Sequence, residues 1–277
     1  MKLIKNIDVS SIWEEINLGI YITGDIHGNP FSRFSTNAFY EQKEFSKNKD
    51  ENIIIELGDF GIIWNGNGEN AEEKYKLDWL AKKNFTVAFI DGNHDNIPQL
   101  DTYPIKEWNG GLVNEIRPNV LRLRRGEIFT IEGKKFFVMG GASSHDIQDG
   151  ILDPDSFDDY DEFRQVWKQW DKEWKMFRVK GLSWWAEELP SAEEMQNGIN
   201  NLEKHNWKVD YILSHTPPAS VIALLGHGLY EQDKLTKYLE DIRSKTEFKR
   251  HWMGHMHVNR QVNDKDILLY EQIIRIA

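Results

Sequence analysis

Short apolar runs in the first third of the chain each end in a glycine and a polar residue. Runs of this length, rich in Ile, Val and Phe, predict buried strands that enter loops. They read G-I-Y-I-T-G-D (19–25), N-I-I-I-E-L-G-D (52–59) and F-T-V-A-F-I-D-G-N (85–93). Between the second and third runs, the spacing of apolar residues predicts a helix with one apolar face formed by Tyr75, Leu77, Trp79 and Leu80. This alternation indicates a parallel sheet, in which ligands bind beyond the carboxyl ends of the strands.

The middle of the chain has a different pattern. Residues 119–141 read as consecutive strands with turns at Arg125-Gly126 and Glu132-Gly133, which predicts an antiparallel meander and a second sheet. A helix is expected at 191–205. The alternation then returns with a strand at 209–215, a helix at 231–244, the strand-and-loop segment K-R-H-W-M-G-H-M-H (249–257) and a closing strand at 267–276.

Residues 146–180 are acidic and rich in tryptophan. Apolar side chains recur at helical spacing within them, so we expect an inserted helical element. The residues are Phe163, Val166, Trp167, Trp170 and Trp174. The insertion could serve as a lid over a site or as a surface for homo-oligomers, and the sequence does not choose between the two.

Composition limits the classes of function. The chain has 277 residues, 40% of them hydrophobic, which is ample for a globular core. No apolar run approaches the length of a membrane span and no signal peptide is visible at the start, so a cytoplasmic protein is expected. The net charge of -11 argues against general nucleic-acid binding, although a local site for a small anion remains compatible with it.

Polar residues follow five of the expected strands. They are Asp25-x-His27, Gly58-Asp59, Gly92-Asn93-His94-Asp95, Ser214-His215 and Gly254-His255-x-His257. Each group alone is an ordinary turn or core feature. Strand-loop geometry would bring them together at one sheet edge, and because the chain has no cysteine, any metal there must have nitrogen and oxygen ligands.

In this order, D-x-H, G-D, G-N-H-D, H and G-H-x-H resemble the calcineurin-like metallophosphoesterase superfamily, over nearly the whole chain. The resemblance implies an α/β fold, a four-layer α/β/β/α sandwich of two mixed sheets flanked by helices. It implies a single domain over residues 1–277 that carries the 146–180 insertion. It also implies a dinuclear centre at the strand ends, with Asp25, His27 and His257 on one metal, Asn93, His215 and His255 on the other, and Asp59 bridging both.

The charge balance agrees with such a centre. The positive charge of two divalent cations is larger than the negative charge of the carboxylates of Asp25 and Asp59. The site would therefore be positive overall and would attract phosphate within an acidic protein. Two metals can clamp phosphoryl oxygens and activate a water as nucleophile. We expect Mn²⁺ as the metal, and the same ligands accept Fe, Zn²⁺ or Ni²⁺.

His94 and Asp95 are the candidates for catalytic roles next to the metals. His94 follows the ligand Asn93, so it could stabilise the phosphoryl group or protonate the leaving oxygen, or it could simply be a loop histidine bonded to Asp95. We interpret Asp95 as an orienting partner rather than a proton donor.

The second motif reads G-D-F-G-I-I-W and lacks the arginine that phosphoprotein phosphatases of this superfamily carry there. Protein phosphatase activity is therefore in doubt. Arg33 could supply the missing cation, or it could be an ordinary solvated helix residue. Ser143, His145 and Arg178 are further candidates for the substrate pocket, because G-G-A-S-S-H-D (140–146) and G-L-S-W-W-A-E-E-L-P (181–190) resemble a pattern in small bacterial and phage metallophosphoesterases.

The leading hypothesis is an enzyme that hydrolyses a small phosphate mono- or diester, such as a nucleotide. A nuclease is the alternative within the enzyme class, and a catalytically silent metal-binding scaffold is the alternative outside it. We expect Trp184 and Trp185 to be core anchors, and His205, His227 and His251 to be structural or surface residues.

Overall fold

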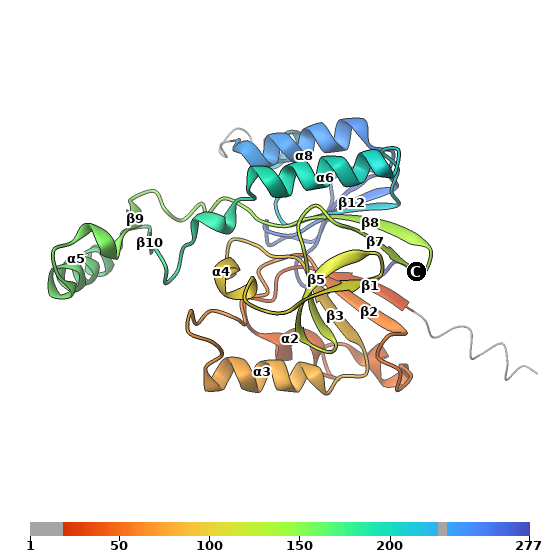
Figure 1. Ribbon diagram of the computed structural model, residues 1–277, viewed down its shortest axis with the longest axis horizontal. Helices are drawn as coiled ribbons and strands as arrows, with labels where there is room; N and C mark the ends of the chain where they lie inside the picture. Colours follow the sequence, from red (N-terminus) through yellow and green to blue (C-terminus); the bar gives the residue numbers. More distant parts are fainter. Residues whose placement is uncertain (1–18, 227–231) are drawn as a thin grey trace, which may run out of the picture.

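The computed structural model describes residues 19–226 and 232–277, so His227 lies outside the described residues. Two mixed β-sheets lie face to face between helical layers (Figure 1). Two helices cover the outer side of one sheet, α2 (Pro30–Phe34) and α3 (Ala71–Ala81). Two others, α6 (Ala192–Lys204) and α8 (Lys234–Lys245), cover the outer side of the other sheet. The four-layer α/β/β/α arrangement expected from the sequence is confirmed.

The first sheet has the strand order β15-β1-β2-β3-β6-β5-β4. Its centre is parallel and consists of β1 (Gly19–Thr23), β2 (Asn52–Glu56), β3 (Thr86–Phe89) and β6 (Val120–Leu123). Antiparallel strands complete both edges, namely β4 (Ile105–Trp108), β5 (Gly111–Arg117) and β15 (Ile273–Arg275).

The second sheet has the order β13-β14-β12-β11-β8-β7. Four strands run parallel, β8 (Lys134–Met139), β11 (Tyr211–Ser214), β12 (Arg250–Met253) and β14 (Asp266–Leu268). The antiparallel edges are β7 (Ile128–Ile131) and β13 (Arg260–Gln261). Short helical elements connect the layers, namely η1 (Tyr40–Glu44), α4 (Ile97–Leu100), η3 (Ala186–Glu188) and α7 (Ala219–Gly226).

Two predicted segments were wrong in the same way. The meander expected at 119–141 is split, because β6 pairs with β3 in the first sheet and only the β7–β8 hairpin belongs to the second. The closing strand expected at 267–276 is also two strands, β14 in the second sheet and β15 in the first. An apolar run shows that a strand is buried, but both sheets bury the same kind of surface, so the pattern does not say which sheet it joins.

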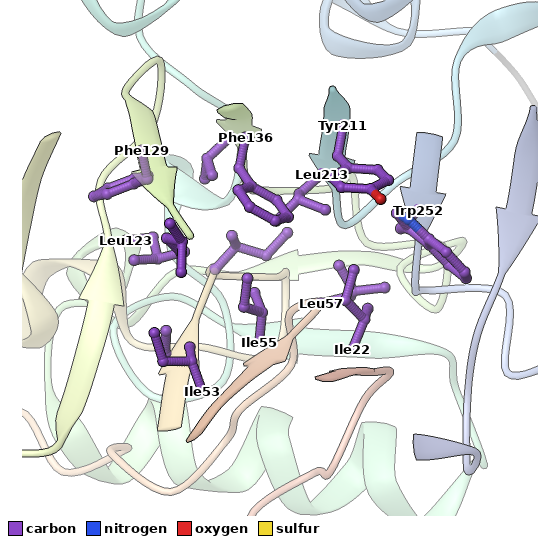
Figure 2. Close-up of a cluster of buried hydrophobic side chains, with 14 of the residues drawn as sticks. Ile22, Ile53, Ile55, Leu57, Leu123, Phe129, Phe136, Tyr211, Leu213 and Trp252 are labelled. Carbon is purple, nitrogen blue, oxygen red and sulfur yellow. The ribbon is translucent and has the colours of Figure 1, made fainter. Parts of the chain in front are cut away.

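The main core lies between the two sheets. Figure 2 shows Ile22, Ile55 and Leu57 of the first sheet and its loops facing side chains of the second. Those facing residues are Phe136, Leu213 and Trp252, all nearly or fully buried. Burying a large apolar side chain contributes roughly 1.5–3 kcal/mol. This shared core holds the two sheets in one fixed relation and therefore fixes the loops at their strand ends.

The apolar face expected for α3 needs one correction. Leu77 and Leu80 are fully buried, but Tyr75 is 64% exposed. The buried position one turn before Leu77 is taken by Glu73, whose carboxylate accepts hydrogen bonds from the backbone N–H groups of Trp64 and Asn70. A charged residue can be buried here because its oxygens are satisfied by the loop that precedes the helix.

The 146–180 insertion forms a small unit of its own (Figure 1). It consists of β9 (Gly150–Leu152), η2 (Pro154–Ser156), α5 (Tyr160–Lys172) and β10 (Phe177–Val179), with β9 and β10 paired in parallel. Phe163 of the predicted helical face is buried in its separate core. Trp174 is 91% exposed, because α5 ends before it. Within the described ranges, no helix has the length and apolar character that a membrane crossing requires.

Candidate metal centre

Five loops converge where the parallel strands of both sheets end. They follow β1, β2 and β3 of the first sheet and β11 and β12 of the second, as the sequence predicted. The side-chain ligand atoms of Asp25, His27, Asp59 and His257 all lie within 4.8 Å of one another. Residues from both ends of the described chain thus meet in one cluster.

A second cluster shares one member with the first. Ligand atoms of Asp59, His215 and His255 also lie within 4.8 Å of one another. Asn93 is beside them, with its Oδ1 3.3 Å from Nε2 of His215. The carboxylate of Asp59 therefore lies between two groups of donors, and the structure brings together all seven residues that the sequence suggested as ligands.

In the first cluster, ring nitrogens point at one another. Nε2 of His27 is 2.8 Å from Nε2 of His257, and Nε2 of His257 is 3.2 Å from Oδ2 of Asp25. The hydrogen bond to Asp25 raises the pKa of His257, whereas burial lowers the pKa of His27. Two imidazole lone pairs and two carboxylates directed at one point are a donor set suited to a divalent cation.

In the second cluster, hydrogen bonds fix the orientation of a ring. Nδ1 of the fully buried His215 lies 2.7 Å from the carbonyl oxygen of Leu57, to which it can donate. Nε2 is then directed at Oδ1 of Asp59, 3.2 Å away. A histidine held in this way by its other nitrogen is typical of metal ligands. Burial lowers the pKa of His255 well below its ordinary value, which favours the neutral ring that a metal requires.

Backbone groups hold the carboxylates in place. The N–H of His255 donates to both oxygens of Asp25 at 3.1 and 3.2 Å, and the N–H of His94 donates to Oδ1 of Asp59 at 2.8 Å. Gly92 allows this close approach, because a Cβ atom there would lie 2.1 Å from Oδ1 of Asp59. The residues present therefore fit a bound metal in donor type and in the convergence of their ligand atoms.

A model of the calcineurin-like phosphoesterase family matches residues 18–259, which include every loop described above. The chain belongs to this family. It is therefore a metallophosphoesterase, an enzyme that hydrolyses phosphate esters with divalent metal. No individually curated protein matches it.

His94 of this phosphoesterase contacts Arg178 at the C-terminal end of the insertion. Its Nε2 lies 3.1 Å from Nη2 of Arg178 on β10, and its ring is 5.2 Å from the ring of His27. Nε of Arg178 donates to Asp146 at 2.9 Å. Burial lowers the pKa of His94 to about 4. The charge of Asp59 raises this pKa and the charge of Arg178 lowers it, but both effects are smaller than that of burial. Arg178, a candidate for the substrate pocket, thus lies beside the catalytic candidate His94.

Asp95 does not make the contact with His94 that was considered for it. Its carboxylate does not hold the His94 ring but accepts hydrogen bonds from the backbone N–H groups of Gly61 and Gly92 at 2.7 and 2.8 Å. Burial and the nearby Asp59 raise the pKa of Asp95 to about 7. The orienting role is therefore directed at the two loops that carry Asp59 and Asn93.

Arg33 is not placed where it could replace the missing phosphate-binding arginine. Its guanidinium is buried and donates to the side chain of Thr23 and to the carbonyl oxygens of Gly24, Asp25 and Tyr270. Neither a substrate contact nor a solvated position matches this environment. Arg33 instead ties the loop of Asp25 to the segment between β14 and β15.

The remaining pocket candidates lie next to the second cluster. Ser143 and His145 line a cavity beside His255, and the rings of His145 and His255 are 5.3 Å apart. Trp185 is buried against Trp64, as expected for a core anchor. His205 is bonded to the backbone of α6 and His251 to Ser214, which agrees with structural roles.

Sequence reasoning missed two acidic residues in this phosphoesterase. Glu188 accepts hydrogen bonds from the backbone and hydroxyl of Ser144, at 3.0 and 2.6 Å, and thereby holds the loop next to Asn93. Asp146 holds Arg178. Both lie in the two motifs, 140–146 and 181–190, that were recognised as a pair, so the pairing was the available signal.

Proposed function

We propose that the enzyme binds two divalent metal ions and hydrolyses small phosphate mono- or diesters, including nucleotides. The observation that carries the proposal is the position of Asp59, whose carboxylate belongs to both donor clusters. Asp25, His27 and His257 would hold one ion, and Asn93, His215 and His255 would hold the other. Mn²⁺ is the favoured metal, with Fe, Zn²⁺ and Ni²⁺ as alternatives that the same ligands accept.

Bound ions would stabilise the charge of the phosphate oxygens. They would also lower the pKa of water, so that a hydroxide nucleophile is available near neutral pH. The residues of the chain then have separate tasks. His94, whose lowered pKa keeps its ring neutral near pH 7, would donate a hydrogen bond to the phosphoryl group or to the oxygen that leaves. Arg178 would keep the His94 ring in place, and Asp95 would keep the loops of Asp59 and Asn93 in register.

The charge of the molecule supports small substrates over nucleic acid. A net charge of -11 would repel a long phosphate backbone, whereas a single phosphate needs only the local positive charge of the centre. Residues 1–277 would act as one metallophosphoesterase domain that carries the insertion, and a cytoplasmic location remains our expectation.

The test is turnover of two chromogenic esters. Purified protein loaded with Mn²⁺ should hydrolyse para-nitrophenyl phosphate or its bis ester, and a chelator should abolish the activity. Absence of turnover of either ester in protein that retains metal would instead support a silent scaffold. Preference for oligonucleotides over nucleotides by a large factor would support the nuclease alternative.

Self-association through the insertion is a separate proposal. Tyr160, Trp174 and Met176 are 66%, 91% and 47% exposed, an unusual density of exposed apolar side chains for one small unit. Sedimentation velocity at several concentrations should show an oligomer for the wild type and a monomer for Trp174→Glu. Identical sedimentation of the two proteins as monomers would reject it.

A further inference from the structure

A cavity of about 410 Å³ opens beside the second donor cluster. His255 forms part of its wall, and so does Thr216, which follows His215 in the chain. Ser144 also lines it and lies 3.5 Å from the amide nitrogen of Asn93. The volume falls within the range of small-molecule sites, roughly 300–1,000 Å³. A phosphate at the metal centre would therefore have room for its ester group on this side.

The wall of the cavity combines apolar and hydrogen-bonding surface. Ile147, Ile222 and Met256 supply the apolar part, from three different loops or helices. Gln148 and Ser143 supply neutral polar groups. Such a lining suits an organic group that has apolar surface and a few polar atoms.

Among the lining residues that the structure describes, the wall of the cavity carries a carboxylate but no lysine or arginine. The carboxylate belongs to Asp233. That carboxylate is held at the start of α8, where its Oδ1 accepts the N–H of Thr236 at 2.7 Å. Apart from the histidines His145 and His255, the described lining residues offer a second anionic group on the substrate no cationic partner, and it would face the fixed charge of Asp233.

We propose that this cavity, the leaving-group pocket, binds the alcohol part of the phosphate ester and selects uncharged leaving groups over anionic ones. This inference rests on the proposed function. It places nucleoside-like or aromatic alcohols among the substrates and disfavours esters whose leaving group bears a further phosphate or carboxylate. Selection of this kind comes from repulsion as much as from attraction.

A matched pair of substrates tests the selection by charge. 4-Carbamoylphenyl phosphate and 4-carboxyphenyl phosphate have leaving groups of nearly equal size, and only the second is anionic at neutral pH. Each would be supplied as the monoester and as the methyl diester, to Mn²⁺-loaded enzyme. We expect kcat/KM for the carbamoyl compound to exceed that for the carboxy compound by about tenfold or more.

Two variants alter the charge of the wall. Ile147→Arg adds a cation to it, and Asp233→Asn removes the anion while keeping a residue that caps α8 equally well. Both should reduce the ratio of the two kcat/KM values, Ile147→Arg by about tenfold and Asp233→Asn by a few fold. The control is Ile105→Arg on β4, where the isoleucine is 55% exposed and does not line the cavity, and its ratio should equal that of the wild type.

The possible outcomes are distinct. A wild-type ratio near one, or a ratio that Ile147→Arg leaves unchanged in protein with normal circular dichroism and metal content, overturns the leaving-group pocket. Hydrolysis of para-nitrophenyl phosphate without hydrolysis of either matched ester overturns it as well. Absence of metal-dependent turnover of all these esters is instead a failure of the proposed function.

Discussion

Four residues of the metal-binding clusters have left-handed backbone conformations. The φ angles are 45° for His27, 61° for Asp59, 64° for His255 and 48° for His257. Only a few per cent of non-glycine residues adopt positive φ, and each such residue costs roughly 1–2 kcal/mol. Strain of this kind persists where the surrounding fold imposes it. Here the two-sheet core keeps the loops bent so that the donors face one another.

Separate roles for metal binding and catalysis lead to opposite outcomes for two substitutions. Asp59→Ala removes the carboxylate shared by both clusters, so the protein should lose bound metal and activity together. His94→Ala should retain metal but lose about 10²–10³-fold in kcat, the usual effect of removing a hydrogen-bond donor to the transition state. Metal content by mass spectrometry, beside turnover of an aryl phosphate, distinguishes the two. A His94→Ala protein emptied of metal would contradict the division of roles.

Arg178 should act through His94 rather than by contact with substrate. Its guanidinium is engaged by Asp146 and by the carbonyl oxygen of Ser183 at 3.1 Å. Arg178→Ala should lower kcat by about 10²-fold, as expected when a catalytic group is displaced, with little change in KM. Arg178→Lys should not restore kcat, because an ammonium group cannot make the forked contact.

A neighbouring cation serves as the control for this prediction. Lys180→Ala removes a charge from the same unit, where it pairs with Asp153 at 2.6 Å and remains exposed. Its kcat should match that of the wild type. An Arg178→Ala enzyme that instead shows a raised KM and a normal kcat would assign Arg178 to substrate binding.

At the scale of elements, a buried ion cluster stabilises the point where the chain crosses between the sheets. Asp91 follows β3 and accepts Nε of Arg122 at 2.9 Å and Nε of Arg125 at 2.7 Å. Arg122 is on β6, and Arg125 lies in the connection from β6 to β7. Both arginines keep the pKa of the Asp91 carboxyl below its ordinary value despite its burial.

Removing the charge of Asp91 should destabilise the fold strongly. Asp91→Asn removes the fully buried anion that the two guanidinium groups share and leaves each with one partly exposed carboxylate, Asp101 for Arg122 and Glu194 for Arg125. The loss of the shared anion should cost about 3–5 kcal/mol of unfolding free energy. Urea denaturation measures this loss. Glu247→Gln at the exposed pair with Lys208, where N and O are 2.7 Å apart, should change the unfolding free energy by less than about 1 kcal/mol.

The elements that sequence predicted best are those with a local signal. The helix at 191–205 is α6, whose N-cap is Ser191 and whose third residue, Glu194, bonds back to the cap. The five polar motifs also lie at the ends of strands, as the apolar runs before them predicted. Partners of Arg33 and Arg178 could not be predicted, because they depend on how loops distant in the chain meet. The division of 119–141 and 267–276 between two sheets depends on the same non-local information.

At the scale of the whole molecule, the insertion is attached by its two ends at one place. The N–H of Asp149 bonds to the carbonyl oxygen of Met176 at 2.9 Å, while Asp146 and Arg178 lie closer to the centre. Replacing residues 154–175, which lie between β9 and β10, by a Gly-Ser linker would leave Arg178 paired with Ile151 and would therefore keep the Arg178–His94 contact. The core of the insertion is separate from the cores of the two sheets, so the remaining protein should fold independently of it.

We expect the deletion protein to retain metal and to hydrolyse small aryl phosphates within about fivefold of the wild-type rate. Changes at distant sites that share no contacts usually act independently, and the insertion has its own core. Thermal unfolding and steady-state kinetics provide the measurements. A folded, metal-loaded deletion protein with almost no turnover would show that the insertion acts as a lid.

The segment between β14 and β15 passes from one sheet to the other and places Tyr270 against the ring of His257, with ring centroids 4.8 Å apart. During synthesis, Asp25 and His27 leave the ribosome long before His257, Tyr270 and β15. The first sheet lacks its β15 edge until that strand is available, and the first donor cluster is incomplete until residue 257 has emerged. A metal held by all four donors would therefore be bound only after residue 257 has emerged, and the ions present where the fold is completed would decide which metal the enzyme takes up.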